Sequence, residues 1–136
     1  MPQEGKPLAH VGPCSVLIVN RSESTRRTLR AVFDSWGYRV DEAVAAEEAL
    51  LLLAYRDYSA ILCDLAMPGM RGDQLFFACR RRCPDKAQRF IFVTGDVVST
   101  WTAYFLATAR QPYLTRPFRV NEIQSAIANL APLPAA

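Results

Sequence analysis

Residues 60–64, Ala-Ile-Leu-Cys-Asp, form an apolar run that ends at a carboxylate, and three other runs of the chain have the same form. These are Val16–Asn20, Phe90–Thr94 and Pro112–Arg116, which end in an amide, a hydroxyl and a guanidinium group. Helix-like segments separate the runs. This alternation predicts a parallel sheet with helices on both faces, because its strands are apolar throughout. Ligands of such sheets bind at the carboxyl ends of the strands, so we expect the four polar end residues to gather in one crevice.

The remaining elements follow from helical periodicity and from helix-breaking residues. Ser22 or Ser24 can cap a first helix, and Gly37 can end it in a left-handed conformation. We expect an edge strand at 38–43, and the later helices at 45–56, 73–83, 99–109 and 120–130. Strict alternation with right-handed crossovers favours a flavodoxin-like (βα)5 three-layer α/β sandwich with the parallel strand order 2-1-3-4-5.

The totals indicate one soluble globular domain. The chain has 136 residues, of which 51% are apolar and 21% charged, and its net charge is +3. We expect the domain at 15–130, with an N-terminal tail at 1–14 and a C-terminal tail or linker at 131–136. No apolar run has the roughly 20 residues of a membrane helix, and no signal-peptide core is present, so we expect a cytoplasmic location.

The cysteines and arginines of the chain do not indicate a metal or nucleic-acid site. The four cysteines form no Cys-x-x-Cys pair, and the single histidine, His10, lies in the predicted tail, so reduced thiols are expected. The arginine clusters at 26–30 and 80–82 are not accompanied by a helix-turn-helix, zinc or RNA-binding motif. Nucleic-acid binding is therefore disfavoured.

Five stretches of the chain together resemble the receiver domain of two-component response regulators. They are LIVNRSESTRRTL (17–29), GYRVDEA (37–43), ILCDLAMPGMRG (61–72), FVTGD (92–96) and YLTRPF (113–118). The resemblance covers residues 15–130, in the expected order and spacing. The segment FLATARQPYLTRPF (105–118) is similar to receivers at the C-terminal end of hybrid sensor kinases.

The resemblance implies a phosphorelay role with Asp64 as the phosphoacceptor, whose carboxylate is the nucleophile. Thr94 matches the hydroxyl that contacts one phosphoryl oxygen, and Arg116 stands where the family has a lysine that contacts another. In the family, the backbone carbonyl at the position of Ala66 binds Mg²⁺. The resemblance also implies a cis peptide bond before Pro117 and a switch aromatic at Tyr113.

The acid pair that helps to bind Mg²⁺ in the family is absent, because Asn20 and Arg21 occupy its two positions. One carboxylate, Asp64, then faces the guanidinium groups of Arg21 and Arg116, and a dication would add to an excess of positive charge. Magnesium also prefers anionic oxygens in an octahedral shell, which Asn20, Asp64 and the Ala66 carbonyl barely supply. Mg²⁺ is therefore disfavoured as a cofactor.

Two mechanisms remain open at this point. In the first, Arg21 replaces the metal: its guanidinium group pairs with Asp64, or with a phosphoryl group on Asp64, and phosphorylation proceeds without metal or with weak or altered Mg²⁺ dependence. In the second, Arg21 pairs permanently with Asp64, and the domain is a phosphorylation-independent pseudo-receiver that acts by binding other proteins. The expected partners are a sensor histidine kinase or a phosphotransfer protein. A homodimer or an output partner could also dock on the face formed by the 99–109 helix, the strand at 112–116 and the last helix.

Enzymes that act on a diffusible substrate fit the sequence poorly. The loop after the first strand, Asn20-Arg21-Ser22-Glu23, is not the Ser/Thr/Gly-rich cradle of a flavin phosphate. Ala66 stands where an aspartate-dependent phosphatase would carry a second acid. Dinucleotide and nucleotide-phosphate motifs are missing, and a catalytic triad lacks its histidine. We therefore expect a protein that is not an enzyme beyond receiving a phosphoryl group on its own aspartate.

Overall fold

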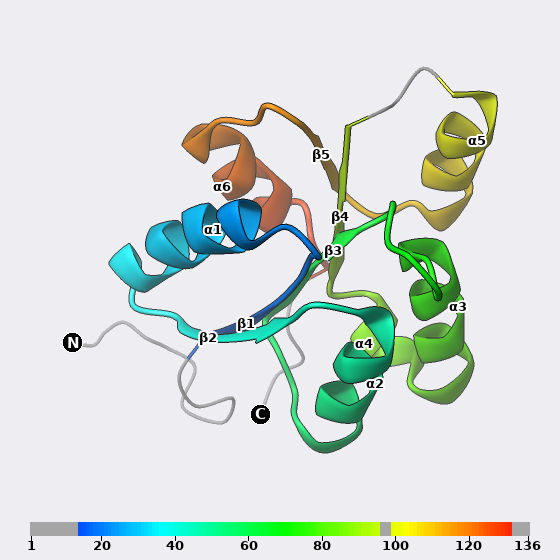
Figure 1. Ribbon diagram of the computed structural model, residues 1–136, viewed down its shortest axis with the longest axis horizontal. Helices are drawn as coiled ribbons and strands as arrows, with labels where there is room; N and C mark the ends of the chain where they lie inside the picture. The colour runs from blue at the N-terminus through cyan, green and yellow to red at the C-terminus, as the bar shows by residue number, and fades with distance from the viewer. Residues whose placement is uncertain (1–13, 96–98, 132–136) are drawn as a thin grey trace.

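A five-stranded parallel sheet with the order β2-β1-β3-β4-β5 forms the centre of the computed structural model (Figure 1). The structure describes residues 14–95 and 99–131, so the predicted tails lie outside the described residues, apart from Cys14 and Ala131. The elements are β1 Ser15–Val19, α1 Glu23–Ser35, β2 Arg39–Ala43, α2 Ala46–Tyr55, β3 Ala60–Asp64, α3 Gly72–Arg82, α4 Pro84–Ala87, β4 Phe90–Thr94, α5 Thr100–Ala109, β5 Tyr113–Thr115 and α6 Val120–Ala128. The predicted fold and strand order are confirmed.

Helices cover both faces of the sheet, as Figure 1 shows, with α1 and α6 on one side and α2, α3 and α5 on the other. Alternate strand residues enter two separate cores. Ile18 and Leu62 pack with Leu29 and Phe33 of α1, whereas Val19 and Cys63 belong to the core beneath α2, α3 and α5. Every residue of β3 and β4 is buried, which explains why both sequences are apolar up to their last residue.

Local sequence signals set the ends of α1. The Ser22 side chain accepts a hydrogen bond from the Thr25 backbone N–H and so caps the helix. After Trp36, Gly37 adopts φ +83°, a left-handed conformation that glycine takes at little cost. The predicted start and stop of this helix are therefore confirmed.

The segment after α3 differs from the prediction. The sequence predicts that Pro84 helps to end the preceding helix, and α3 does end at Arg82. The structure adds a short helix, α4, with Pro84 in its first turn. Proline is favoured at that position, because the first helical N–H has no partner within the helix and the fixed φ suits the helix.

No helix in the part of the chain that the structure describes is both long enough and apolar enough to cross a lipid bilayer.

Candidate functional site

The parallel pairing of the strands brings their polar end residues to one edge of the sheet. Val19 lies opposite Cys63, so the next residues, Asn20 and Asp64, follow side by side, and Asp64 itself lies opposite Val93. Thr94 ends β4, and Arg116 follows β5 directly. Only 1% of Asn20, 2% of Asp64 and 5% of Thr94 is exposed, so the polar groups form a largely enclosed site.

The backbone around Asp64 holds its carboxylate in place. The Ala66 backbone N–H donates a 3.1 Å hydrogen bond to Asp64 Oδ1, and the Leu65 N–H donates to the Val93 carbonyl at 3.1 Å. The first residue of α3, Gly72, presses against the same turn. A Cβ atom on Gly72 would lie 2.3 Å from the Asp64 carbonyl oxygen and 2.9 Å from Leu65 Cα. The helix can approach the aspartate this closely only because residue 72 has no side chain.

Burial is the dominant influence on the charge of Asp64. It raises the pKa of the carboxyl group above its ordinary value, while the Ala66 N–H, Arg116 and Arg21 each act in the lowering direction. Among the described residues, no cationic side chain lies within 4.0 Å of the Asp64 carboxylate. The permanent Arg21–Asp64 pair that the pseudo-receiver mechanism requires is therefore not seen. The two arginines act on Asp64 through space.

Arg116 has a defined place above the end of β4. Its guanidinium group lies over Gly95, where a Cβ atom would be 3.3 Å from Arg116 Nη2. The Arg116–Pro117 peptide bond is cis, as expected. Arg116 and Pro117 also line a cavity of about 420 Å³ together with the hydroxyl-bearing residues Ser24, Thr25 and Thr28 of α1. This cavity gives a route by which a partner group could approach Arg116 from the α1 side.

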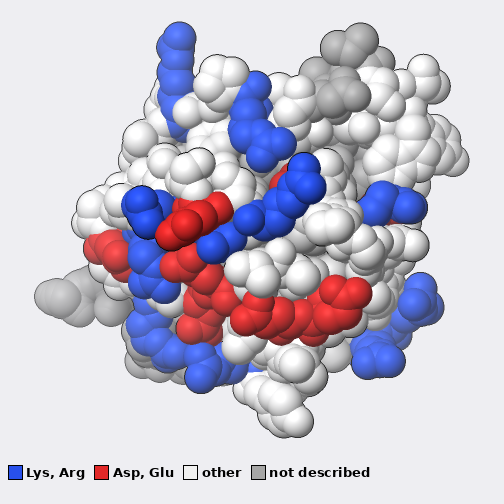
Figure 2. Space-filling model, in the orientation of Figure 1, with Lys and Arg blue, Asp and Glu red and all other residues white. Residues whose placement is uncertain are grey.

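Arg21 is exposed, whereas its neighbour Asn20 is tied into the fold. Asn20 Oδ1 accepts a 2.9 Å hydrogen bond from the Ser22 backbone N–H, and the Asn20 carbonyl accepts one of 2.8 Å from Arg26 Nη1. Arg26 also pairs with Glu42 on β2 through its Nε atom. Figure 2 shows acidic and basic side chains side by side over α1 and β2. Asn20 thus links the site, through Arg26, to the ion pair with Glu42.

The residues at the site do not fit a magnesium ion. The amide oxygen of Asn20 is occupied by the Ser22 N–H, and its other polar atom, Nδ2, is a hydrogen-bond donor that cannot bind a cation. Asp64 then supplies the site's carboxylate, with two arginines acting on it. Over residues 14–95 and 99–131, no group of three or more His, Cys, Asp or Glu side chains could hold a metal ion. This donor set suits an anion better than a hard dication.

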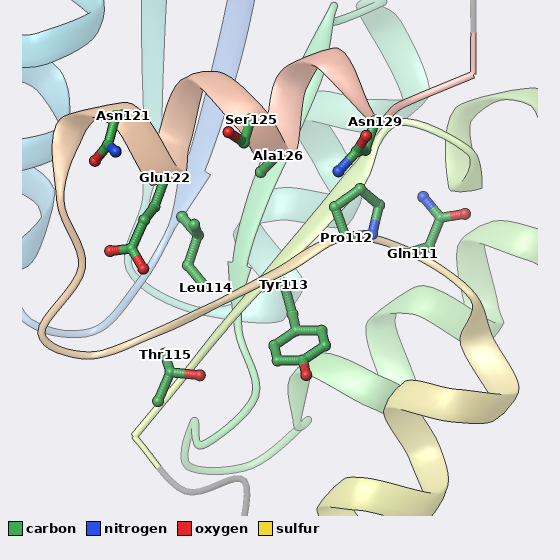
Figure 3. A pocket seen from close by; sticks show the side chains of 10 residues that line it. All are labelled: Gln111, Pro112, Tyr113, Leu114, Thr115, Asn121, Glu122, Ser125, Ala126 and Asn129. Carbon is green, nitrogen blue, oxygen red and sulfur yellow. The ribbon is translucent and has the colours of Figure 1, made fainter.

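Tyr113, the predicted switch aromatic, lies apart from the crevice. It pairs in register with Phe92, two residues before Thr94, and is 48% exposed. Figure 3 shows its side chain beside a hollow between β5 and α6, which Glu122 and Ser125 line from the helix side. The volume of this hollow is about 470 Å³. The switch role of Tyr113 stays a prediction.

Aromatic residues on α5 divide between core and surface. Phe105 is buried, Tyr104 is 71% exposed, and Trp101 is 46% exposed and stacks on Phe105 with ring centroids 5.7 Å apart. The Arg71 guanidinium carbon lies 5.8 Å from the centroid of the Trp101 ring, in a cation–π contact. Because Arg71 belongs to the loop between Asp64 and α3, this contact joins the aspartate loop to α5.

Sequence reasoning missed the packing roles of Gly72, Gly95 and Arg71. The sequence places Gly72 in a turn and gives Gly95 no role. The contacts that make both positions special depend on the folded backbone: Gly72 meets the turn at Asp64, and Gly95 meets Arg116, which follows another strand. Gly95 directly follows the polar end residue Thr94, and a glycine at such a position is the signal that could have suggested a close backbone approach.

The family comparison agrees with this geometry. The model of the response regulator receiver domain family matches residues 16–128. The chain therefore belongs to the receiver domains of two-component signalling.

Individual relatives show how much of a longer protein such a domain can represent. Sensor histidine kinase AruS of Pseudomonas aeruginosa is 28% identical over 126 residues, which are 91% of this chain and 13% of that protein. Aerobic respiration control protein ArcA of Escherichia coli is 30% identical over 116 residues, or 85% of this chain and 47% of that protein. The chain thus spans less than half the length of either relative.

A solved structure with the same fold is the receiver domain of sensor histidine kinase PA1611 from Pseudomonas aeruginosa. It has a TM-score of 0.76 and 22% sequence identity, and the alignment covers 88% of this chain and 98% of that one. That structure is described with a magnesium ion coordinated in its active-site cleft. Receiver domains typically bind Mg²⁺ in this cleft. That Asn20 and Arg21 stand at the positions of a metal-binding acid pair stays a prediction.

Proposed function

We propose that this receiver domain accepts a phosphoryl group on Asp64 without requiring a divalent cation. The observation that carries the proposal is a buried carboxylate held by the backbone, with no cation within 4.0 Å among the described residues. In a pseudo-receiver of the kind described above, an arginine would form an ion pair with the Asp64 carboxylate. Asp64 is instead oriented by the Ala66 N–H, with positive charge nearby to stabilise added phosphoryl oxygens.

Phosphoryl transfer needs mainly positioning and charge stabilisation from the protein. Because the Ala66 N–H holds Oδ1, we assign the attack on phosphorus to Oδ2. The bond from phosphorus to the donor breaks as the new O–P bond forms, and the donor leaves with the bonding electrons. Arg116 at the end of β5 and Thr94 at the end of β4 are the residues that we assign to the phosphoryl oxygens. Arg21 contributes positive charge from the exposed side.

The donor that we propose is a phosphohistidine on a sensor histidine kinase or a phosphotransfer protein. Receiver domains of two-component systems interact with such proteins, and one relative of this chain is named as a sensor histidine kinase. Because the chain spans 13% of that relative, attachment to a kinase stays a proposal. We take residues 15–130 as the unit that receives the phosphoryl group.

A second candidate function is a phosphorylation-independent interaction module. The exposed aromatics Trp101 and Tyr104 on α5 and Tyr113 on β5 favour it, since aromatic side chains are enriched at protein interfaces. An output partner or a second copy would dock on this α5-β5-α6 face. The two candidates differ in whether Asp64 is ever modified.

The deciding experiment treats the full chain with acetyl phosphate or phosphoramidate, in Mg²⁺ or in EDTA, and measures the intact mass. We expect the mass gain of one phosphoryl group in both conditions, and its loss in Asp64→Asn. Asp73→Asn is the matched control, because Asp73 is also a buried aspartate but its carboxylate is paired with Arg71. Phosphorylation that strictly requires Mg²⁺ would contradict the proposal, and no modification in either condition would favour the interaction module.

The charge arrangement can be tested in the same assay. Arg116→Gln removes the guanidinium group that lies over Gly95, and we expect metal-free phosphorylation to slow about tenfold to a hundredfold, the value of one charge-assisted hydrogen bond. Arg82→Gln removes an exposed arginine at the far end of α3 and should leave the rate unchanged. Equal rates in both variants would exclude Arg116 from the phosphoryl site.

A further inference from the structure

The amide nitrogen of Asn20 is a buried hydrogen-bond donor without a partner. Among the buried side-chain nitrogen and oxygen atoms of the described residues, Asn20 Nδ2 alone lacks a hydrogen bond. The residue is 1% exposed and directly follows β1, at the edge of the sheet that carries Asp64. Buried donors without partners are rare because they cost stability, so this atom needs an explanation.

The orientation of the Asn20 amide is fixed by its neighbour. Oδ1 accepts the 2.9 Å hydrogen bond from the Ser22 backbone N–H. A half-turn of the amide would place the NH₂ group against that N–H, so that two donors would face each other. The Ser22 N–H therefore keeps the oxygen on its own side and directs Nδ2 away from it.

The strand register places Asn20 beside Asp64 on the same side of the sheet. Val19 pairs with Cys63, and the preceding pair, Ile18 and Leu62, points into the core beneath α1 and α6. Because side chains alternate along a strand, the next pair, Asn20 and Asp64, is directed to that same side. Adjacent strands lie about 4.8 Å apart, which is within reach of a group carried on the aspartate.

We propose that Asn20 Nδ2 donates a hydrogen bond to an oxygen of the phosphoryl group on Asp64. This inference rests on the proposed function and adds a binding residue to it. An aspartate at position 20 could keep the Ser22 bond with one oxygen and offer the other to a cation. Asparagine keeps the Ser22 bond but offers a donor, which suits an anionic oxygen. The phosphoryl group is then held by Asn20 from the β1 side and by Arg116 from the β5 side.

Three variants of the full chain test this role in EDTA, with acetyl phosphate as the donor. Asn20→Asp keeps an acceptor for the Ser22 N–H but loses the donor, whereas Asn20→Ala loses both. We expect both to slow phosphorylation by about tenfold or more, since a hydrogen bond to a charged group is lost. Mg²⁺ should partly restore the rate of Asn20→Asp but not that of Asn20→Ala. Asn121→Ala, on an exposed position of α6, should react like the wild type.

A spectroscopic measurement separates direct contact from a merely structural role. Asn20, Asn121 and Asn129 are the three asparagines of the chain, so selective ¹⁵N labelling gives three side-chain amide signals, and Asn20→Asp identifies the one from Asn20. We expect the Asn20 signal to shift on phosphorylation while the Asn121 and Asn129 signals stay in place. Two outcomes would overturn this inference alone. In the first, the wild type is phosphorylated but its Asn20 signal does not shift. In the second, the wild type is phosphorylated at the same rate as Asn20→Ala and Asn20→Asp. A wild type that is never phosphorylated overturns the proposed function and this inference with it.

Discussion

Two carboxylates of this domain, Glu42 and Asp64, each have two arginines near them, yet they are held in different ways. Glu42 on β2 accepts hydrogen bonds from Arg26 and Arg30, and these contacts, led by that of Arg30, lower the pKa of the Glu42 carboxyl group. Asp64 is influenced by Arg116 and Arg21 through space, and burial raises the pKa of its carboxyl group. The comparison shows that two arginines can either bind a carboxylate directly, as at Glu42, or influence it without contact, as at Asp64.

The two carboxylates also differ in what fixes their positions. Two long side chains clamp Glu42 at a partly exposed edge strand. Backbone groups fix Asp64: the Ala66 N–H binds its Oδ1 atom, and Gly72 packs against its carbonyl. A site that must accept a new group gains from this arrangement, since no side-chain ion pair has to break before the reaction.

The largest expected effect comes from disturbing the backbone support of Asp64. Gly72→Ala would place a methyl group 2.3 Å from the Asp64 carbonyl oxygen, so either the start of α3 or the aspartate turn must move. We expect a loss of about 3 kcal/mol in the free energy of unfolding, at the upper end for overpacking, together with slower phosphorylation. Urea denaturation measures the first effect and intact-mass kinetics the second.

Gly37→Ala is the matched control for this substitution. Gly37 has φ +83°, but a Cβ atom there would meet nothing within 4 Å. Its cost should be that of backbone strain alone, about 1 kcal/mol, without any change in phosphorylation. If both glycine variants lose equal stability, the close approach of Gly72 to Asp64 does not hold the site.

The contrast between the two carboxylates also shows what the sequence could predict. The apolar runs and their polar ends were enough to predict the strand order and the gathering of Asn20, Asp64, Thr94 and Arg116, because parallel strands end at one edge. The absence of an Arg21–Asp64 contact could not be predicted. The sequence places Arg21 beside the site, but the direction of a long exposed side chain depends on neighbours and on solvent.

The close backbone contacts at Gly72 and Gly95 could not be predicted from the sequence either. The Gly72 contact depends on how α3 meets the turn after β3, and the place of Arg116 depends on Gly95 at the end of another strand. The first depends on the folded path of the loop between Asp64 and Gly72, and the second joins two segments that are distant in the sequence. The unpartnered Nδ2 atom of Asn20 likewise depends on a three-dimensional contact, the hydrogen bond from the Ser22 N–H to Asn20 Oδ1.

Neutralising each carboxylate should change stability in opposite directions. Glu42→Gln removes the charge that binds Arg26 and Arg30, and we expect a loss of about 1 kcal/mol at pH 7, in the range of partly exposed ion pairs. Asp64→Asn removes a buried charge that no cation contacts, and we expect a gain of about 1 kcal/mol, typical when a site is relieved of functional strain. Thermal and urea unfolding at pH 7 measure both changes.

Lowering the pH should bring both variants towards the wild type, from opposite sides. The folded state lowers the pKa of Glu42 below its ordinary value of 4.5, so its stabilising effect is present at neutral pH and is lost as the pH falls through the lowered pKa. The folded state raises the pKa of Asp64 above 3.8, so its charge destabilises the protein at neutral pH, and this penalty disappears as the carboxyl group is protonated. An Asp64→Asn variant that is less stable than the wild type at pH 7 would show that Asp64 is paired like Glu42.

The smallest expected effect is a magnesium response created at position 21. Arg21→Asp removes one cation from the site and adds a carboxylate beside Asp64, so two acids and the Ala66 carbonyl become available to a hard dication. Mg²⁺ at a concentration equal to its Kd stabilises a protein by RT ln 2, about 0.4 kcal/mol, or about 2 °C in Tm. We expect this shift in Arg21→Asp, no shift in the wild type, and no shift in Arg82→Asp, which makes the same charge change at the far end of α3.

Combining Arg21→Asp with Asp64→Asn should abolish the response, because both carboxylates are needed. A wild-type Tm that rises with Mg²⁺ as much as that of Arg21→Asp would mean that Asn20 and Arg21 do not exclude the metal from the site of Asp64.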